Sequence, residues 1–256
     1  GQNHRIYFCL FSLAVRGNYM AFNKWVIAFC PYWITFLAIQ LATRLFLLFY
    51  SGAITDVTAV QLIQIFASGF IFDVQALGFF LVPVIVFHLF QGRRDAPGRL
   101  YAFLRFVSFT GFAFIWLFAA VSEFFFWQEF GTRFNFIAVD YLVYTQEVIG
   151  NIRESYPLTP ILAALACAAL FLTWCWRRFL SLQPAWPDMR QFRIAGVLLI
   201  ITPFLTCAIL DDSMTSRIGD TQSTQEIAKN GTYALFSAYR SNELDFKGFY
   251  MVEPEQ

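Results

Sequence analysis

Long apolar runs separated by short polar stretches dominate the chain. Five of these runs are long enough for a helix that crosses a lipid bilayer, which takes roughly 20 residues. Because backbone groups in lipid must be hydrogen-bonded within their own segment, each run is expected to be helical. The pattern therefore predicts an all-α, polytopic membrane protein. The predicted spans are 25–49, 70–90, 100–121, 158–176 and 194–210.

Arginine and lysine residues between the spans predict the orientation of the chain. The stretch "QGRRDAPGR" after the second span holds three arginines, and the stretch 177–193 after the fourth span holds four. The N-terminal segment is also basic, whereas the stretch after the first span has no basic residue. By the positive-inside rule, the N-terminus and the two arginine-rich loops are cytoplasmic. Five spans then place the C-terminal part outside.

The same pattern predicts three parts along the chain. Residues 1–24 form a cytoplasmic or interfacial N-terminal segment, residues 25–210 form a five-helix transmembrane domain, and residues 211–256 form an extracytoplasmic juxtamembrane linker. Because the chain begins with Gly1, we expect a fragment or a processed product of a longer protein.

The composition excludes several classes of function. The chain is 58% hydrophobic and 14% charged, whereas a soluble domain carries about 25% charged residues. Its net charge is +1 and its basic residues form no stripe, which argues against a nucleic-acid partner. No motif of a nucleotide-binding, hydrolytic or zinc-dependent enzyme occurs, so the sequence indicates no catalytic residue and no metal ligand in this chain.

Two ionisable residues, Arg44 and Asp73, are notable within the predicted spans. Arg44 is expected close to the outer end of the first span, and Asp73 close to the outer end of the second. Charges in lipid are costly and usually pair or reach water. One interpretation is an ion pair, in which case exchanging the two residues should restore the folding that either single variant loses. The other is that each side chain extends separately to the membrane surface.

The predicted exterior loop 122–157 is rich in aromatic and polar residues. From Asn135 onward, Phe136, Val139 and Val143 recur at helix-like spacing, which predicts a helix in the plane of the interface. The loop is either a structural collar over the spans or a surface that binds a lipid headgroup or a neighbouring domain. In the second case its contact residues are Arg133, Asn135, Asp140, Tyr141 and Tyr144.

The tail 211–256 is polar and contains an amphipathic stretch around 225–239. Five residues of this stretch are predicted to share one apolar face: Ile227, Tyr233, Leu235, Phe236 and Tyr239. The tail is too short and irregular for a catalytic domain, so we interpret it as a connector that leads away from the membrane.

Three stretches resemble one protein family. "FWQEFGTRFNFIAVDYLVYTQEVIGNIRESYPL" (126–158) is similar to the exterior loop of the lipoteichoic-acid-synthase-like family, which is sulfatase-like and transfers phosphoglycerol or phosphoethanolamine. "FASGFIFDVQAL" (66–77) resembles that family's second-span motif, although Ile71 stands where a basic residue is expected. "EIAKNGTYALFSAYRSNELDFKGFY" (226–250) resembles the linker before the catalytic domain.

The resemblance implies a domain that this chain lacks. In the family, an extracytoplasmic domain of alkaline-phosphatase fold carries a threonine nucleophile and a divalent metal, manganese or similar. The resemblance thus implies the membrane anchor of a bacterial cytoplasmic-membrane transferase, with membrane phospholipid and its own missing domain as partners. The candidate residues for presenting the lipid donor are Arg44, Asp73, Arg133, Asn135, Asp140, Tyr141 and Tyr144.

Two other functions fit the sequence. One is a stand-alone, non-catalytic membrane protein that binds lipid or a partner transferase through the loop 122–157. The other is a small transporter, which would need polar residues along a path across the bilayer. The charges within the spans are predicted only near the outer face, which disfavours the transporter.

Overall fold

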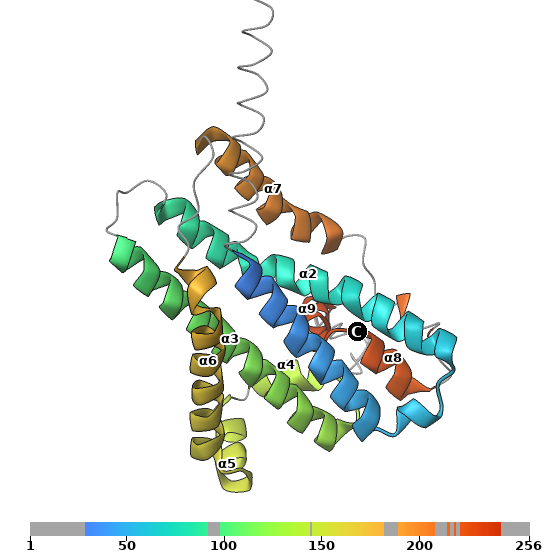
Figure 1. Cartoon of the computed structure of the whole chain (residues 1–256). Helices are drawn as coiled ribbons and strands as arrows, with labels where there is room; N and C mark the ends of the chain where they lie inside the picture. The colour runs from blue at the N-terminus through green and yellow to red at the C-terminus, as the bar shows by residue number, and fades with distance from the viewer. Residues whose placement is uncertain are drawn as a thin grey trace, which may run out of the picture. The chain divides into compact units, whose positions relative to one another are not determined.

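The regular structure of the protein is helical throughout the residues described by the computed structural model (Figure 1). These residues are 29–91, 98–143, 145–181, 189–207, 214–215, 218 and 221–241. Four helices are long and apolar enough to cross a membrane, as the hydrophobic pattern predicts. They are Phe29–Tyr50, unlabelled and blue in Figure 1, α2 (Ala59–Gln91, with the apolar part Ala59–Val86), α3 (Gly98–Phe130) and α6 (Leu158–Leu180).

Shorter helices connect or follow these four. A 3₁₀ turn, η1 (Ala53–Thr55), lies between Phe29–Tyr50 and α2. The loop 122–157 contains α4 (Phe136–Val143) and α5 (Thr145–Ser155), and the tail contains α8 (Gln222–Ala228) and α9 (Gly231–Ser241). The predicted fifth span coincides largely with α7 (Met189–Cys207), whose apolar part Gly196–Thr206 is shorter than the other four. The fifth crossing and the orientation therefore stay predictions.

Two of the predicted span boundaries were wrong because local helix signals were overlooked. Helix α2 begins at Ala59, well before residue 70, because Thr58 and Gln61 form a capping box. The Thr58 amide donates to Gln61 Oε1 at 2.8 Å, and the Gln61 amide donates to Thr58 Oγ1 at 3.3 Å. Helix α3 continues past residue 121 to Phe130, where Gly131 adopts a left-handed φ of 66° and ends it.

The chain divides into two compact units. The first comprises Gly1–Ala38, Leu77–Leu117 and Leu165–Ile209. Aromatic rings form its core: Phe36 and Phe80 meet the Trp116 ring edge-on at centroid distances of 4.4 and 4.2 Å. Such edge-to-face pairs favour a fixed packing beyond simple burial. Helices α3 and α6 are also joined by a 2.9 Å hydrogen bond between the hydroxyls of Thr110 and Thr173.

The second unit comprises Ile39–Ala76, Phe118–Ala164 and Leu210–Gln256. Its apolar core joins the end of helix Phe29–Tyr50, the start of α2, the end of α3 and the tail. Burial of these side chains fixes the tail against the apolar helices. The core residues are Leu47, Leu48, Ala53, Ile65, Trp127, Ile218, Ile227 and Ala228.

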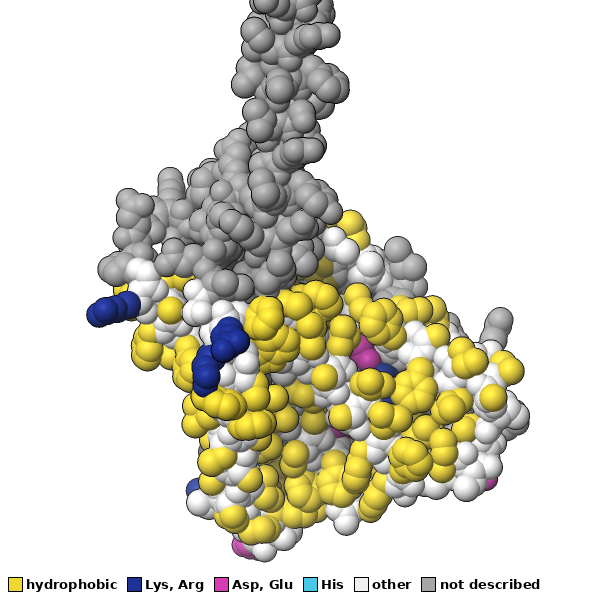
Figure 2. Space-filling view, viewed as in Figure 1, with side chains coloured by type: hydrophobic (Ala, Val, Ile, Leu, Met, Phe, Trp, Pro, Cys, Tyr) yellow, Lys and Arg dark blue, Asp and Glu magenta, His cyan; other side chains and the backbone are white. Residues whose placement is uncertain are grey.

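Apolar side chains also cover the outside of the molecule. On the face drawn in Figure 2, hydrophobic atoms make up most of the described surface. Large side chains in the candidate spans are strongly exposed, including Phe103 at 61% and Phe171 at 62%. A contiguous apolar surface of this kind suits lipid as the surrounding solvent.

Candidate functional site

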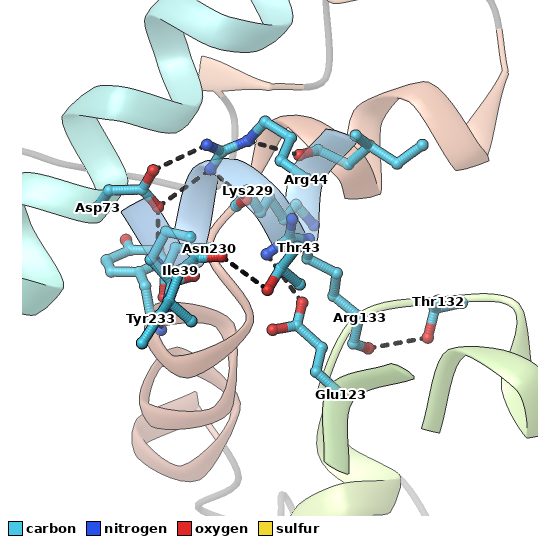
Figure 3. A network of polar contacts seen from close by, with 12 residues as sticks. Ile39, Thr43, Arg44, Asp73, Glu123, Thr132, Arg133, Lys229, Asn230 and Tyr233 are labelled. Carbon is cyan, nitrogen blue, oxygen red and sulfur yellow. Dashed lines mark hydrogen bonds and ion pairs between the residues drawn. The ribbon is translucent and has the colours of Figure 1, made fainter. Parts of the chain in front are cut away.

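A buried ion pair joins helix Phe29–Tyr50 to α2. The Arg44 Nη1 atom lies 2.7 Å from Asp73 Oδ2, and Nη2 lies 3.0 Å from Asp73 Oδ1 (Figure 3). Both residues are buried, at 1% and 3% exposure. This two-pronged geometry is the strongest arrangement available to an arginine and a carboxylate. The structure therefore supports the ion pair, and not the separate extension of each side chain to the membrane surface.

The remaining donors of Arg44 bind the tail. Its Nε atom donates to the carbonyl oxygen of Ile227 at 3.2 Å, and Nη2 donates to that of Lys229 at 3.2 Å. These carbonyls lie at the C-terminus of α8, where the helix has unsatisfied acceptors and a partial negative charge. Arg44 thus forms hydrogen bonds with the C-terminal end of α8 as well as with Asp73.

A glycine makes room for the Arg44 guanidinium. Gly69 lies one turn before Asp73 on α2, and a Cβ atom added there would overlap the Arg44 Cζ, Nε and Nη2 atoms. The guanidinium therefore lies directly against the backbone of α2. The stretch 66–77 supplies both the acidic partner and the space that the cation needs.

Asn230 connects three segments through one side chain. Its Oδ1 atom accepts a 3.0 Å hydrogen bond from the Tyr233 amide and so caps α9. Its Nδ2 atom donates to Asp73 Oδ1 at 2.8 Å and to Gln40 Oε1 at 3.1 Å. Asn230 is fully buried, so each of these bonds satisfies a polar atom that water cannot reach.

A second buried ion pair, between Glu123 and Arg133, approaches the same turn of the tail (Figure 3). Arg133 Nη1 lies 2.8 Å from Glu123 Oε1, and the side chains are 0% and 4% exposed. Within the described residues, the Nε and Nη2 atoms of Arg133 have no hydrogen-bond partner. Burial lowers the pKa of Arg133, and the Glu123 carboxylate acts in the opposite direction.

The Glu123 carboxylate lies against the N-terminus of α9. A Cβ atom added to Gly231 would overlap the Glu123 carboxyl group. A negative charge at this position is stabilised by the partial positive charge of the helix N-terminus. We call the six residues Arg44, Asp73, Glu123, Arg133, Asn230 and Gln40 the polar cluster.

The other sequence-predicted site residues lie outside the polar cluster. Asn135 is half-buried and caps α4, because its Oδ1 accepts a 2.9 Å hydrogen bond from the Ile137 amide. Asp140 is exposed on α4, as is Tyr141 at 42%, whose ring lies 5.9 Å from that of Phe130. Tyr144 lies outside the described residues.

The two predicted amphipathic faces were partly wrong. In the loop, Val139 is 3% exposed whereas Phe136 is 58% exposed, so the buried face of α4 is centred elsewhere. Helix α4 packs against α9 within the second unit. In the tail, the turn at Asn230 divides the stretch into two helices. Phe236 and Tyr239 are therefore exposed at 58% and 69%, whereas Ile227 and Tyr233 are buried.

Sequence reasoning missed three charged or polar contributors. Glu123 interrupts the run "VSEFFFW" and could have been recognised as an acid in an apolar helix. The dipeptide Asn230–Gly231 is a signal for a helix break and cap. Arg105 was missed although it lies inside the predicted third span. It is 0% exposed in α3, and its Nη1 atom donates to the Phe179 carbonyl at 3.4 Å. The statement that charges lie only near the outer face was therefore wrong.

The polar cluster is suited to holding segments together. Its two cations and two anions balance, and Asp73 accepts hydrogen bonds from both Arg44 and Asn230. In the described part of the chain, no group of three or more His, Cys, Asp or Glu residues could hold a metal ion. The described residues thus do not fit the divalent metal of the resembled family, and we derive no step through it.

Comparison of the chain with protein-family models, with curated proteins and with solved structures gave no match.

Proposed function

We propose that this chain is the membrane-anchoring and lipid-donor-presenting part of a lipoteichoic-acid-synthase-like transferase. Such an enzyme transfers a phosphoglycerol or phosphoethanolamine group from a membrane phospholipid to an envelope acceptor. In this proposal the chain lies in the bacterial cytoplasmic membrane, with its N-terminus inside and its C-terminus outside. The metal-dependent chemistry belongs to a further extracytoplasmic domain.

One observation carries the proposal. The three stretches that resemble the family are far apart in sequence, yet each contributes to the polar cluster. Asp73 comes from 66–77, Arg133 from 126–158 and Asn230 from 226–250. The three stretches thus contribute to one buried polar network.

The cluster also explains how an anchor would work. The tail is bonded to the apolar helices through Arg44 and Asp73, and α9 packs against α4 of the exterior loop. A domain that follows the tail would therefore start from a fixed position beside α4. Such pre-positioning of a reacting group near its substrate is a large part of catalytic efficiency.

The mass of the native protein tests the proposal first. An antibody against the loop 122–157 would capture the product from its own membranes for intact mass measurement. A species far heavier than 29.5 kDa supports the anchor. A species near that mass contradicts it and favours a free-standing protein that binds lipid or a partner transferase.

Substitutions in the loop 122–157 test the role in presenting lipid. In the complete enzyme, Tyr141→Ala together with Tyr144→Ala should impair transfer from phospholipid vesicles while cleavage of a soluble phosphodiester persists. Phe136→Ala, also exposed on α4, is the matched control and should leave both activities unchanged. Equal loss of both activities would indicate damage to folding and contradict the presenting role.

A further inference from the structure

The turn between α8 and α9 lies beside the middle of two candidate membrane-spanning helices. Helix Phe29–Tyr50 has 22 residues and therefore rises about 33 Å, close to the ~30 Å hydrocarbon thickness of a bilayer. Gln40, which binds Asn230 at 3.1 Å, lies near the middle of this helix. From Gln40 to Tyr50 the helix rises about 15 Å. If the helix spans the membrane, Asn230 is well below its end.

The position of Asp73 along helix α2 also places Asn230 far from the end of a candidate span. Asp73, which binds Asn230 at 2.8 Å, lies about 21 Å along α2 from Ala59 at the helical rise of 1.5 Å per residue. Ile227 and Ala228 at the end of α8 share one apolar core with Ile65 of α2, so the chain just before the turn also packs along this helix.

The backbone polar groups at the turn between α8 and α9 have the hydrogen bonds that irregular backbone inside lipid requires. Irregular backbone at membrane depth is tolerated only where protein groups take its hydrogen bonds. Arg44 binds the carbonyls of Ile227 and Lys229, and Asn230 caps α9. The charged side chain of Lys229 is itself paired with Glu226, at 2.9 Å.

We propose that α8 and α9 form a re-entrant helix pair inside the membrane and that α9 presents an aromatic face to lipid. This face consists of Phe236 and Tyr239, one turn apart and 58% and 69% exposed, while Tyr233 packs inward on Phe72 at a ring distance of 4.7 Å. The occupant is lipid because the turn before α9 lies beside the middle of two candidate spans, and the face is exposed to a similar extent as Phe70 of α2, at 55%.

Spin-label accessibility tests the proposal in the full chain. The five cysteines are first replaced by serine, and a nitroxide is attached to Phe236→Cys or Tyr239→Cys in phosphatidylcholine–phosphatidylglycerol vesicles. Collisions with oxygen report lipid, and collisions with a water-soluble nickel chelate report water. Phe171→Cys on α6 is the lipid control, and Asp56→Cys on the exposed turn is the water control. The native cysteines are Cys9, Cys30, Cys167, Cys175 and Cys207.

The expected result is an oxygen-to-nickel collision ratio at residues 236 and 239 that matches Phe171→Cys and exceeds Asp56→Cys. A ratio like that of Asp56→Cys would place α9 in water and overturn the proposal. Low accessibility to both reagents would also overturn it, because a protein neighbour would then cover the face. The proposal applies to an enzyme anchor and to a free-standing protein alike, so its failure is distinct from failure of the proposed function.

Discussion

The Nδ2 atom of Asn230 lies 2.8 Å from Oδ1 of Asp73, although 157 positions separate the two residues. The same oxygen accepts a 3.0 Å hydrogen bond from Arg44. Asp73 is therefore the shared acceptor for a span residue and a tail residue. Its removal should therefore weaken two connections at once.

We predict that Asp73→Asn strongly destabilises the protein. The substitution leaves the Arg44 guanidinium buried without a counter-charge, and breaking a buried pair in this way costs about 3–5 kcal/mol. The matched control is Asp56→Asn on the exposed turn, which should change stability by less than about 0.5 kcal/mol. The readout is the fraction of detergent-solubilised protein that remains monodisperse after heating. If both variants lost half of the monodisperse protein at the same temperature, a stabilising role of the pair would be contradicted.

Exchanging the two charges should not restore stability, contrary to the expectation from sequence. An aspartate at position 44 cannot donate to the carbonyls of Ile227 and Lys229, and an arginine at position 73 cannot accept from Asn230. The double variant Arg44→Asp/Asp73→Arg should therefore unfold at least as easily as Asp73→Asn in the same heating assay. Full recovery would mean that the bonds to the tail contribute little.

Gly69→Ala should destabilise the protein because the new methyl group displaces the Arg44 guanidinium. Gly111→Ala is the matched control, since Gly111 is also helical and a Cβ there meets nothing within 4 Å. Alanine is favoured over glycine in a helix by about 1 kcal/mol, so the control should be neutral or stabilising. Titration with a denaturing detergent, followed by circular dichroism, measures both. The two substitutions should shift the midpoint in opposite directions.

The pair of Glu123 and Arg133 should show strong coupling. Glu123→Leu or Arg133→Leu alone leaves one buried charge unpaired, whereas the double substitution removes both charges, which is often neutral or stabilising. We expect the double variant to be more stable than either single variant in a double-mutant cycle of unfolding free energies. Glu129→Leu, at an exposed position of the same helix, is the control. Additive effects would show that the ion pair does not operate in the folded protein.

Asn230→Ala should cost more stability than Thr221→Ala, although both remove a helix cap. Thr221 only caps α8, through a 3.4 Å hydrogen bond from the Thr224 amide, and loss of such a cap costs about 1 kcal/mol. Asn230 also donates to Asp73 and Gln40. Limited proteolysis within the tail measures the difference as the rate of cleavage. Similar rates for the two variants would contradict the role of Asn230 as a connector.

The ion pair of Arg44 and Asp73 was one of two interpretations that the sequence left open, because charges in apolar runs have few ways to be stabilised. The pair forms even though the span boundaries behind that prediction were partly wrong. The sequence contained the correcting signals, since Thr58 and Gln61 have the spacing of a capping box and Gly131 ends a run of helix formers. Boundary residues deserve the same scrutiny as hydrophobicity.

The contributions of Gln40, Gly69 and Asn230 could not be predicted in the same way. Each is a common residue whose role depends on contacts with a distant segment. The dipeptide Asn230–Gly231 signals a helix break, but it does not reveal which distant residues Asn230 binds. Gly69 is informative only once the Arg44 guanidinium is known to lie against it. The structure was needed to show that the tail belongs to the same packed unit as the spans.

The late position of Asn230 has a consequence for biosynthesis. During translation, Arg44 and Asp73 are made long before the carbonyls and the amide that complete their bonding, since the Lys229 carbonyl lies 185 positions after Arg44. Until then the inserted helices hold a partly satisfied charge pair in the membrane. The tail therefore completes the packing of this unit. A nascent chain halted before the tail would leave the Arg44–Asp73 pair incompletely hydrogen-bonded and accessible to membrane quality-control proteases.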